Sequence, residues 1–135
     1  MRKYLRYVSV LAILLLLGVA PVVKAATVDF NITVTSNQLN QDPKSKRVLK
    51  NTDGSTYFYV TPSYFSRSGS IRVRSVQLDN KKIASGKHLI SSKETGSKKI
   101  FTYDKAVAGG VYYYMESFYA ASSGNSINVK GRYTP

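Results

Sequence analysis

The sequence predicts an all-β protein, a single small antiparallel β-sandwich that follows a cleaved signal peptide. Two observations lead to this class. Apolar and polar residues alternate in several runs of residues 26–135, and turn-forming residues separate these runs about every 8–12 residues, as in small sandwiches. The 135 residues suffice for one domain with one core. A small barrel is the second candidate.

The first 25 residues have the layout of a secretory signal peptide. Three basic residues precede the apolar run Val8–Ala20, and Val23 and Ala25 provide the small side chains expected before a cleavage site. The run is too short to span the roughly 30 Å hydrocarbon core of a bilayer, although an uncleaved anchor is the alternative. We therefore expect a mature domain of residues 26–135 that is secreted and extracellular, and either released or associated with the cell surface.

Three strands are predicted in the first part of this domain. Val28–Thr35 alternates apolar and polar residues, as a half-buried strand does. Thr56–Thr61 is rich in β-branched and aromatic residues, and Pro62 is expected to end it. Ile71–Leu78 also alternates, but its apolar residues change phase near Ser75, which predicts a β-bulge there.

The second part of the domain contains three further strong candidates and the chain has two weaker ones. The strong candidates are Ile100–Tyr103, the long run Val111–Ala121, and Ile127–Tyr133. The weaker candidates are Arg47–Lys50 and His88–Ser91. No run after residue 25 has the 3.6-residue period of an amphipathic helix, so helices are not expected.

Turn-forming residues separate the runs. Asp53-Gly54 is a strong hairpin signal, because glycine adopts a positive φ without steric cost. Asp79-Asn80 predicts a turn after Ile71–Leu78, and the polar residues 122–125 join the last two strands.

Residues 36–52 form a polar and basic segment that allows two interpretations. It is either a flexible basic loop or an edge strand whose lysines prevent pairing with other sheets. Its basic residues are Lys44, Lys46, Arg47 and Lys50. A second basic zone lies between Lys81 and Lys99 and includes Lys98.

Composition argues against an enzyme. Without cysteine the chain has no disulfide framework, zinc ribbon or thiol nucleophile, and His88 is the only histidine, so two-histidine sites are excluded. We expect His88 to be an ordinary surface residue, and the two glutamates and the turn aspartates do not form a recognisable catalytic pair. No catalytic residue, metal site or cofactor is therefore expected.

The mature domain is strongly basic. Cleavage after Ala25 would remove four basic residues and no acidic one. The remaining 110 residues contain 16 Lys and Arg against 7 Asp and Glu, which gives a net charge of +9. A charge of this size concentrates a small protein near polyanions, such as wall polymers and anionic lipid headgroups. It also keeps a strand-rich protein soluble, and the sequence leaves both interpretations open.

Tyrosine is unusually frequent, and both faces of Val111–Ala121 are aromatic. Tyr113 and Tyr119 lie on one face, and Tyr112, Tyr114 and Phe118 lie on the other. One face must line the core, whereas the other is either covered or exposed. Exposed tyrosines beside basic residues suit sugar rings, protein partners or membrane interfaces.

Two stretches carry a resemblance to known proteins. Ala108–Tyr114 is similar to the start of a late strand in immunoglobulin-like sandwiches, where a corner tyrosine caps a loop between strands. The signal peptide and the C-terminal Val129–Pro135 resemble those of small secreted proteins of Gram-positive bacteria that end in a KGRYTP-like tail, and more distantly the lactococcin 972-like bacteriocins. The resemblance implies a secreted β-sandwich with an immunoglobulin-like plan, and it transfers no functional residue.

We therefore expect a secreted, non-enzymatic binding module for anionic cell-envelope material or for a protein partner. Its expected partners are an anionic wall polymer, a membrane surface or an extracellular protein, without specific nucleic acid. The candidate ligand-binding residues are Lys44, Lys46, Arg47, Lys50, Lys98, Lys99, Tyr112 and Tyr114. The alternative is a secreted antibacterial, bacteriocin-like protein whose positive charge draws it to target envelopes.

Overall fold

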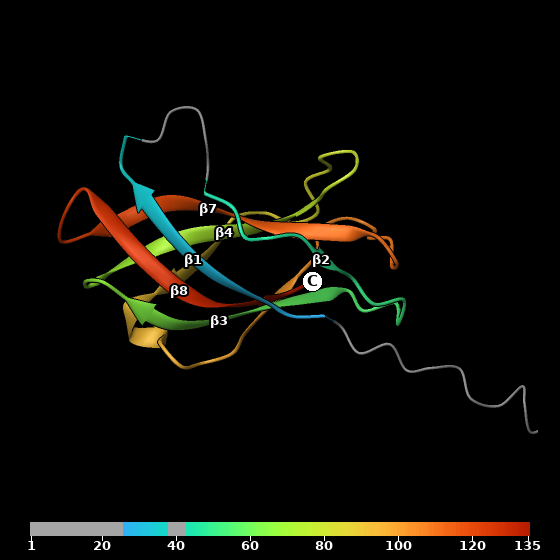
Figure 1. Cartoon of the computed structure of the whole chain (residues 1–135), viewed down its shortest axis with the longest axis horizontal. Helices are drawn as coiled ribbons and strands as arrows, with labels where there is room; N and C mark the ends of the chain where they lie inside the picture. The colour runs from blue at the N-terminus through green and yellow to red at the C-terminus, as the bar shows by residue number, and fades with distance from the viewer. Residues whose placement is uncertain (1–25, 38–42) are drawn as a thin grey trace, which may run out of the picture.

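Two antiparallel sheets packed face to face form the molecule, which confirms the predicted all-β sandwich (Figure 1). The computed structural model describes residues 26–37 and 43–135, so the expected signal peptide lies outside the described residues. No helix in these two ranges is long and apolar enough to cross a membrane.

Each sheet has four strands. The first contains, in order, β1 (Val28–Thr35), β8 (Ser126–Thr134), β3 (Tyr57–Phe65) and β6 (Lys99–Thr102). The second contains β2 (Val48–Leu49), β7 (Tyr112–Ser122), β4 (Gly69–Gln77) and β5 (His88–Ser91). A single 3₁₀ turn, η1 (Ser92–Glu94), connects β5 to β6. Each of the eight runs predicted as strands corresponds to one of these strands.

Pro62 does not end its strand, contrary to the sequence prediction. β3 continues to Phe65, and its pairing with β8 shifts register between Pro62 and Tyr64. A bulge of this kind tolerates a residue without an N–H group. The opposite residue is Gly131, where a Cβ would lie 2.4 Å from the Thr61 carbonyl oxygen, so only glycine permits this close approach.

The change of phase near Ser75 is not a bulge. β4 and β7 stay in continuous register from Ile71 to Gln77, and their register shift lies between Ser70 and Ile71 instead. Residues 75–77 are all buried because β4 is covered on both faces at this end. Ser75 points into the core, whereas Val76 lies beside Tyr114 on the outer face.

Asp53-Gly54 forms a turn but not a hairpin. Gly54 has a φ of +72°, and the Ser55 amide donates to the Asp53 carboxylate at 2.9 Å. The flanking strands β2 and β3 belong to different sheets, so the chain crosses from one sheet to the other at this turn. Asp79-Asn80, in contrast, does lie in a turn that returns to β4, with the Gln77 amide donating to the Lys82 carbonyl.

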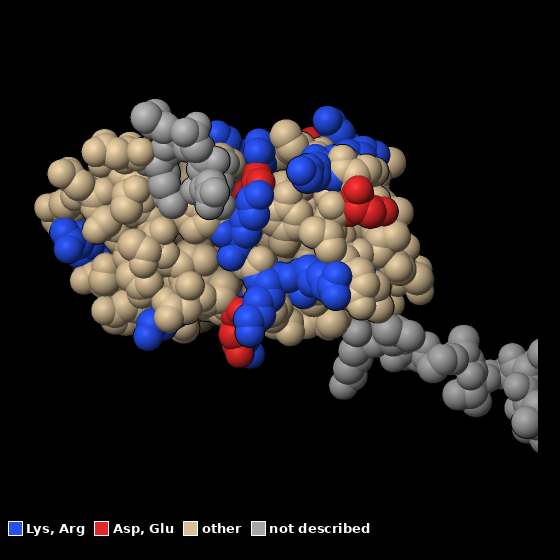
Figure 2. Space-filling view, turned by 45° about the horizontal axis from the view of Figure 1, so that its top comes forward, with Lys and Arg blue, Asp and Glu red and all other residues tan. Residues whose placement is uncertain are grey.

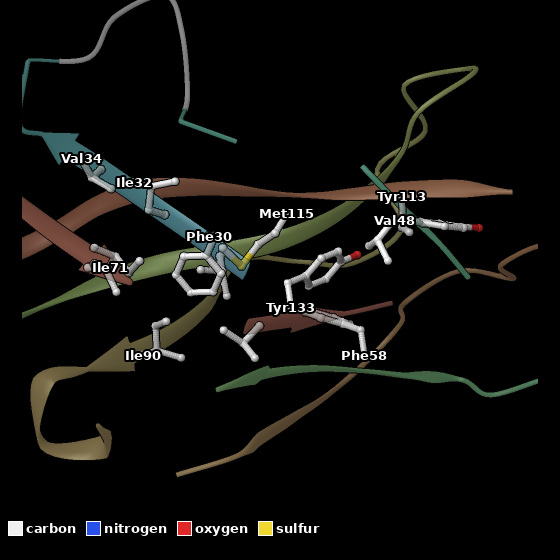
Figure 3. Close-up of a cluster of buried hydrophobic side chains, with 14 of the residues drawn as sticks. Phe30, Ile32, Val34, Val48, Phe58, Ile71, Ile90, Tyr113, Met115 and Tyr133 are labelled. Carbon is white, nitrogen blue, oxygen red and sulfur yellow. The ribbon is translucent and has the colours of Figure 1, made fainter. Parts of the chain in front are cut away.

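Aliphatic and aromatic side chains from both sheets fill the space between them (Figure 3). At one end of this core, fully buried Tyr133 from β8 shares a 2.6 Å hydrogen bond with the Ser75 hydroxyl of β4, which joins the two sheets. Tyr113 donates to the Ala108 carbonyl and so closes the loop before β7. Burial raises the pKa values of Tyr113 and Tyr133, so both phenols stay neutral.

His88 is packed rather than being an ordinary surface residue. Its ring stacks on Phe101 with 4.5 Å between centroids and meets Phe58 edge-on at 5.7 Å. The sequence pattern at the start of β5 gave no sign of these contacts, because both phenylalanines come from the opposite sheet.

Lys50 is buried, which corrects the expectation that it belongs to an exposed basic surface. Its backbone pairs with Val111 and Gly110 beside β7, and its side chain is directed inward, with 2% of the residue exposed. The ammonium lies 5.1 Å from the centroid of the Tyr103 ring and has no hydrogen-bond partner among the described residues. Burial lowers the pKa of Lys50, and Asp53 partly opposes this change.

We predict that the hydrogen bond between Tyr133 and Ser75 stabilises the sandwich. Tyr133→Phe leaves the Ser75 hydroxyl buried without its partner, so the free energy of unfolding should fall by about 1–3 kcal/mol. The double variant with Ser75→Ala removes both polar groups and should recover part of that loss. Urea denaturation of the parent, both single variants and the double variant measures the coupling, and strictly additive losses would contradict the prediction.

We predict that replacing Lys50 with methionine stabilises the protein. Because burial holds the Lys50 pKa below its ordinary value of 10.5, the unfolded chain binds more protons between the two values, and parent stability gains from Lys50 as pH rises through this interval. Lys50→Met should abolish this gain and raise the free energy of unfolding at pH 7 by about 1–2 kcal/mol. Urea denaturation at several pH values tests both effects. A less stable methionine variant would show that the contact with Tyr103 outweighs the cost of burial.

Candidate functional site

The basic segment before β2 lies along the edge of β7. Its described part, residues 43–50, forms backbone hydrogen bonds with β7, among them Ser45 to the Met115 carbonyl at 2.8 Å and Ser117 to the Pro43 carbonyl at 2.9 Å. This arrangement favours the edge-strand interpretation for residues 43–50, whereas residues 38–42 lie outside the described residues. We call residues 43–50 the edge segment.

Cations cover the outer face of β7. Tyr113, Met115 and Ser117 are buried toward the core, so the alternating residues point outward. The outward residues are Tyr112, Tyr114, Glu116 and Phe118. From the edge segment, the Arg47 guanidinium lies 5.0 Å from the Tyr112 ring centroid and the Lys44 ammonium 5.3 Å from that of Tyr114.

The same arrangement continues toward the other end of β7. Phe118 has Arg74 of β4 on its ring at 4.9 Å and the Lys87 ammonium at 3.7 Å. Contacts of this kind attract a cation to the electron-rich face of a ring. Together the three outward rings and their four cations form a cation–aromatic row on the outer surface of the second sheet.

Glu116 holds two of these cations in place. Its carboxylate accepts a hydrogen bond from Arg74 Nε at 2.7 Å and lies 3.5 Å from the Lys44 ammonium. The Glu116 side chain is 9% exposed, so its charge is largely shielded from solvent and requires these partners. Burial and the Glu116 carboxylate raise the pKa of Tyr114, whose hydroxyl therefore stays neutral.

Two pockets are lined by residues of the edge segment, and a third pocket adjoins one of them. A small pocket of about 230 Å³ is lined by Lys44, Ser45, Arg47, Leu78, Lys81 and Tyr114. A side pocket of about 180 Å³ adjoins the small pocket at Leu78 and is also lined by Asp79, Gly110, Val111 and Tyr112. A large open pocket of about 600 Å³ shares Lys44 and Ser45 and extends to Asp29, Lys46 and Lys130. The pockets therefore adjoin one another.

The structure brings together four of the predicted site residues and places a fifth nearby. Lys44 and Arg47 lie over Tyr114 and Tyr112, and Lys46 is exposed beside the large pocket. Tyr114 is not an exposed platform, however. It is 7% exposed because Lys44 and the neighbouring strand cover it, and it contributes only part of its ring to the small pocket.

Lys98 and Lys99 belong to a different surface. Lys98 precedes β6 and lies 4.0 Å from the ring of Tyr59 on the first sheet, and Lys99 forms an ion pair with Glu94. The second basic zone therefore divides between the two sheets, and of its residues only Lys81 lines the small pocket.

Sequence reasoning included Lys81 and Lys87 only as members of the second basic zone, and it missed Arg74, Leu78 and Glu116, which complete the site. The alternation that placed Tyr112 and Tyr114 on one face also places Glu116 there, and Arg74 stands on the same face of its own predicted strand. The position of Lys81 and Lys87 beside β7 has no local signal in the sequence, because the connection between β4 and β5 places both residues there.

In Figure 2 most of the charged side chains in view are basic, and many of them gather in the middle and toward the right of the molecule. The small pocket combines three cations with an aromatic wall and an apolar residue, and none of the described carboxylates lines it. This arrangement suits an anionic group that carries a carbon skeleton. Compared with known protein families, with curated proteins and with solved structures, the chain matches none.

Proposed function

We propose that the protein is a secreted, non-enzymatic binding module for anionic cell-envelope material. The binding surface is the edge segment with the three pockets around it. One observation carries this proposal: Lys44, Arg47 and Lys81 converge on a pocket that is walled by Tyr114 and that no carboxylate of residues 26–37 and 43–135 lines.

The arrangement of the cations favours binding over a role in solubility alone. Solubility requires only dispersed charge, which long exposed side chains supply without fixed positions. Lys44 and Arg47 instead lie over aromatic rings, and Glu116 further restrains Lys44. Side chains restrained in this way lose less rotamer entropy when a ligand binds, so more of the interaction energy is retained as affinity.

The net charge of the mature domain and its expected location indicate the class of ligand. The mature domain carries a net +9, and its expected place is outside the cell. The polyanions abundant there are wall polymers and anionic membrane surfaces. A bacteriocin-like protein would also be attracted to cell envelopes, but it would in addition kill the target cell. No contact among the described residues favours that additional step.

We predict salt-dependent binding to purified cell walls. The Debye length falls from about 8 Å at physiological salt to about 3 Å at 1 M, so co-sedimentation with walls should weaken steeply over that range. Neutralising Lys44, Lys46 and Arg47 together, each to glutamine, should weaken binding at physiological salt by about tenfold, which corresponds to about 1.4 kcal/mol. Thermal stability should fall only slightly, because the three side chains are exposed and Arg74 still pairs with Glu116 when Lys44 is neutral.

A matched variant controls for net charge. Lys93, Lys105 and Arg132 are exposed and line none of the three pockets, so their joint change to glutamine removes the same charge elsewhere. This variant should lose less than about twofold. Equal losses in both variants, or equal binding to DNA, would show diffuse attraction and overturn the proposed site. Clearing of a bacterial lawn by the purified protein would instead support the antibacterial alternative.

A further inference from the structure

We infer that the small pocket is a recognition site for one phosphodiester group, and that the adjoining side pocket takes the hydroxyl-bearing unit next to it. The ligand class is a polyol or sugar polymer linked by phosphodiesters. This inference rests on the proposed function and assigns its ligand chemistry.

The cations of the small pocket come from separate parts of the chain. Lys44 and Arg47 belong to the edge segment, whereas Lys81 belongs to the turn after β4. Cations from separate elements approach a bound group from different directions. A phosphodiester has two charged oxygens and two ester oxygens arranged tetrahedrally around phosphorus, whereas a carboxylate has two oxygens in one plane. Arginine adds a planar fork that matches two phosphate oxygens.

The charges of Arg47 and Lys81 are available to a ligand. Within residues 26–37 and 43–135, ion pairs involve Lys44, Arg74 and Lys99, but neither Arg47 nor Lys81. The carboxylate of Glu116 offsets part of the Lys44 charge. Counted over the part of the chain that the structure describes, the pocket therefore retains about two uncompensated positive charges, which is enough to balance a phosphodiester and leave a net attraction.

The backbone at Lys81 is strained. Its φ of +52° is the only positive value at a residue other than glycine in the described ranges, and asparagine or glycine would adopt it at lower cost. The Asn80 carboxamide accepts a hydrogen bond from the Lys82 amide at 2.9 Å, which fixes the turn. This conformation turns the Lys81 side chain toward the small pocket, whereas Lys82 bonds to the Ala106 carbonyl instead.

The side pocket has a different character. Its described lining contains no cation and combines the exposed Tyr112 ring, the Asp79 carboxylate and apolar groups. A carboxylate repels a second phosphate but accepts hydrogen bonds from hydroxyl groups, and a tyrosine ring packs against a sugar face. The small pocket equals about seven or eight water volumes, which accommodates a phosphate with a few carbons. A polymer that alternates phosphate with polyol fits both pockets.

The experiment compares ligands that share charge but differ in chemistry. The full mature domain is titrated onto purified walls, onto the same walls after hydrofluoric acid has removed phosphodiester polymers, and onto soluble polyglutamate. We expect binding to intact walls to exceed binding to treated walls and to polyglutamate by about tenfold or more. Glycerophosphoglycerol, a soluble phosphodiester with a single negative charge, should compete, whereas acetate at equal ionic strength should not. Vesicles of phosphatidylglycerol, which carry the same phosphate and polyol chemistry, distinguish a lipid source from a wall source.

The variant Lys81→Asn separates binding from folding. Asparagine tolerates the positive φ, so thermal stability should be unchanged or higher, while binding to intact walls should fall by about fivefold. Lys82→Gln, the matched neighbour, should change binding less than twofold.

Equal binding to treated walls or to polyglutamate would overturn the phosphate assignment and leave the proposed function standing. Equal effects of the two lysine variants would also overturn the assignment. Failure to bind any wall or vesicle at low salt would overturn the proposed function as well.

Discussion

β7 is aromatic on both faces, but a two-layer sandwich covers only one of them. Its inner face packs against the first sheet through Tyr113 and Met115. No third layer covers its outer face among the described residues, and cations from the edge segment, from β4 and from Lys87 just before β5 lie there instead. The way this one strand is covered determines where the basic residues gather and where the pockets form.

The sequence predicts the strands well because their signal is local. A period of two depends only on which residues face the core, so each predicted run corresponds to a strand. Three predictions are wrong because the structure at each position depends on distant partners. They are the strand end at Pro62, the bulge near Ser75 and the hairpin at Asp53-Gly54. Pro62 is tolerated by a bulge opposite Gly131, and the turn at Asp53-Gly54 changes sheets. Neither fact is contained in the neighbouring sequence.

The site was only partly predictable for the same reason. Alternation placed Tyr112 and Tyr114 on one face, and composition indicated the basic segment, but neither could pair Lys44 with Tyr114 or Arg47 with Tyr112. Lys50 shows the limit most clearly. Lys50 is basic like its neighbours in the segment, yet the backbone pairing with Val111 directs its side chain inward. Exposure within a basic segment depends on strand orientation, which composition does not contain.

The contacts that cover β7 also prepare it for a ligand. A cation that lies on a ring shields that face of the ring from water. The side of the cation that points away from the ring can still contact an anion. Glu116 restrains Lys44 and Arg74 through its carboxylate, so the cation–aromatic row keeps its geometry without a bound ligand. Folding therefore contributes part of the ordering entropy that a flexible basic loop would lose only on binding. Fewer cations are then needed for a given affinity, and the position of Lys81 at the small pocket matters more than the total charge.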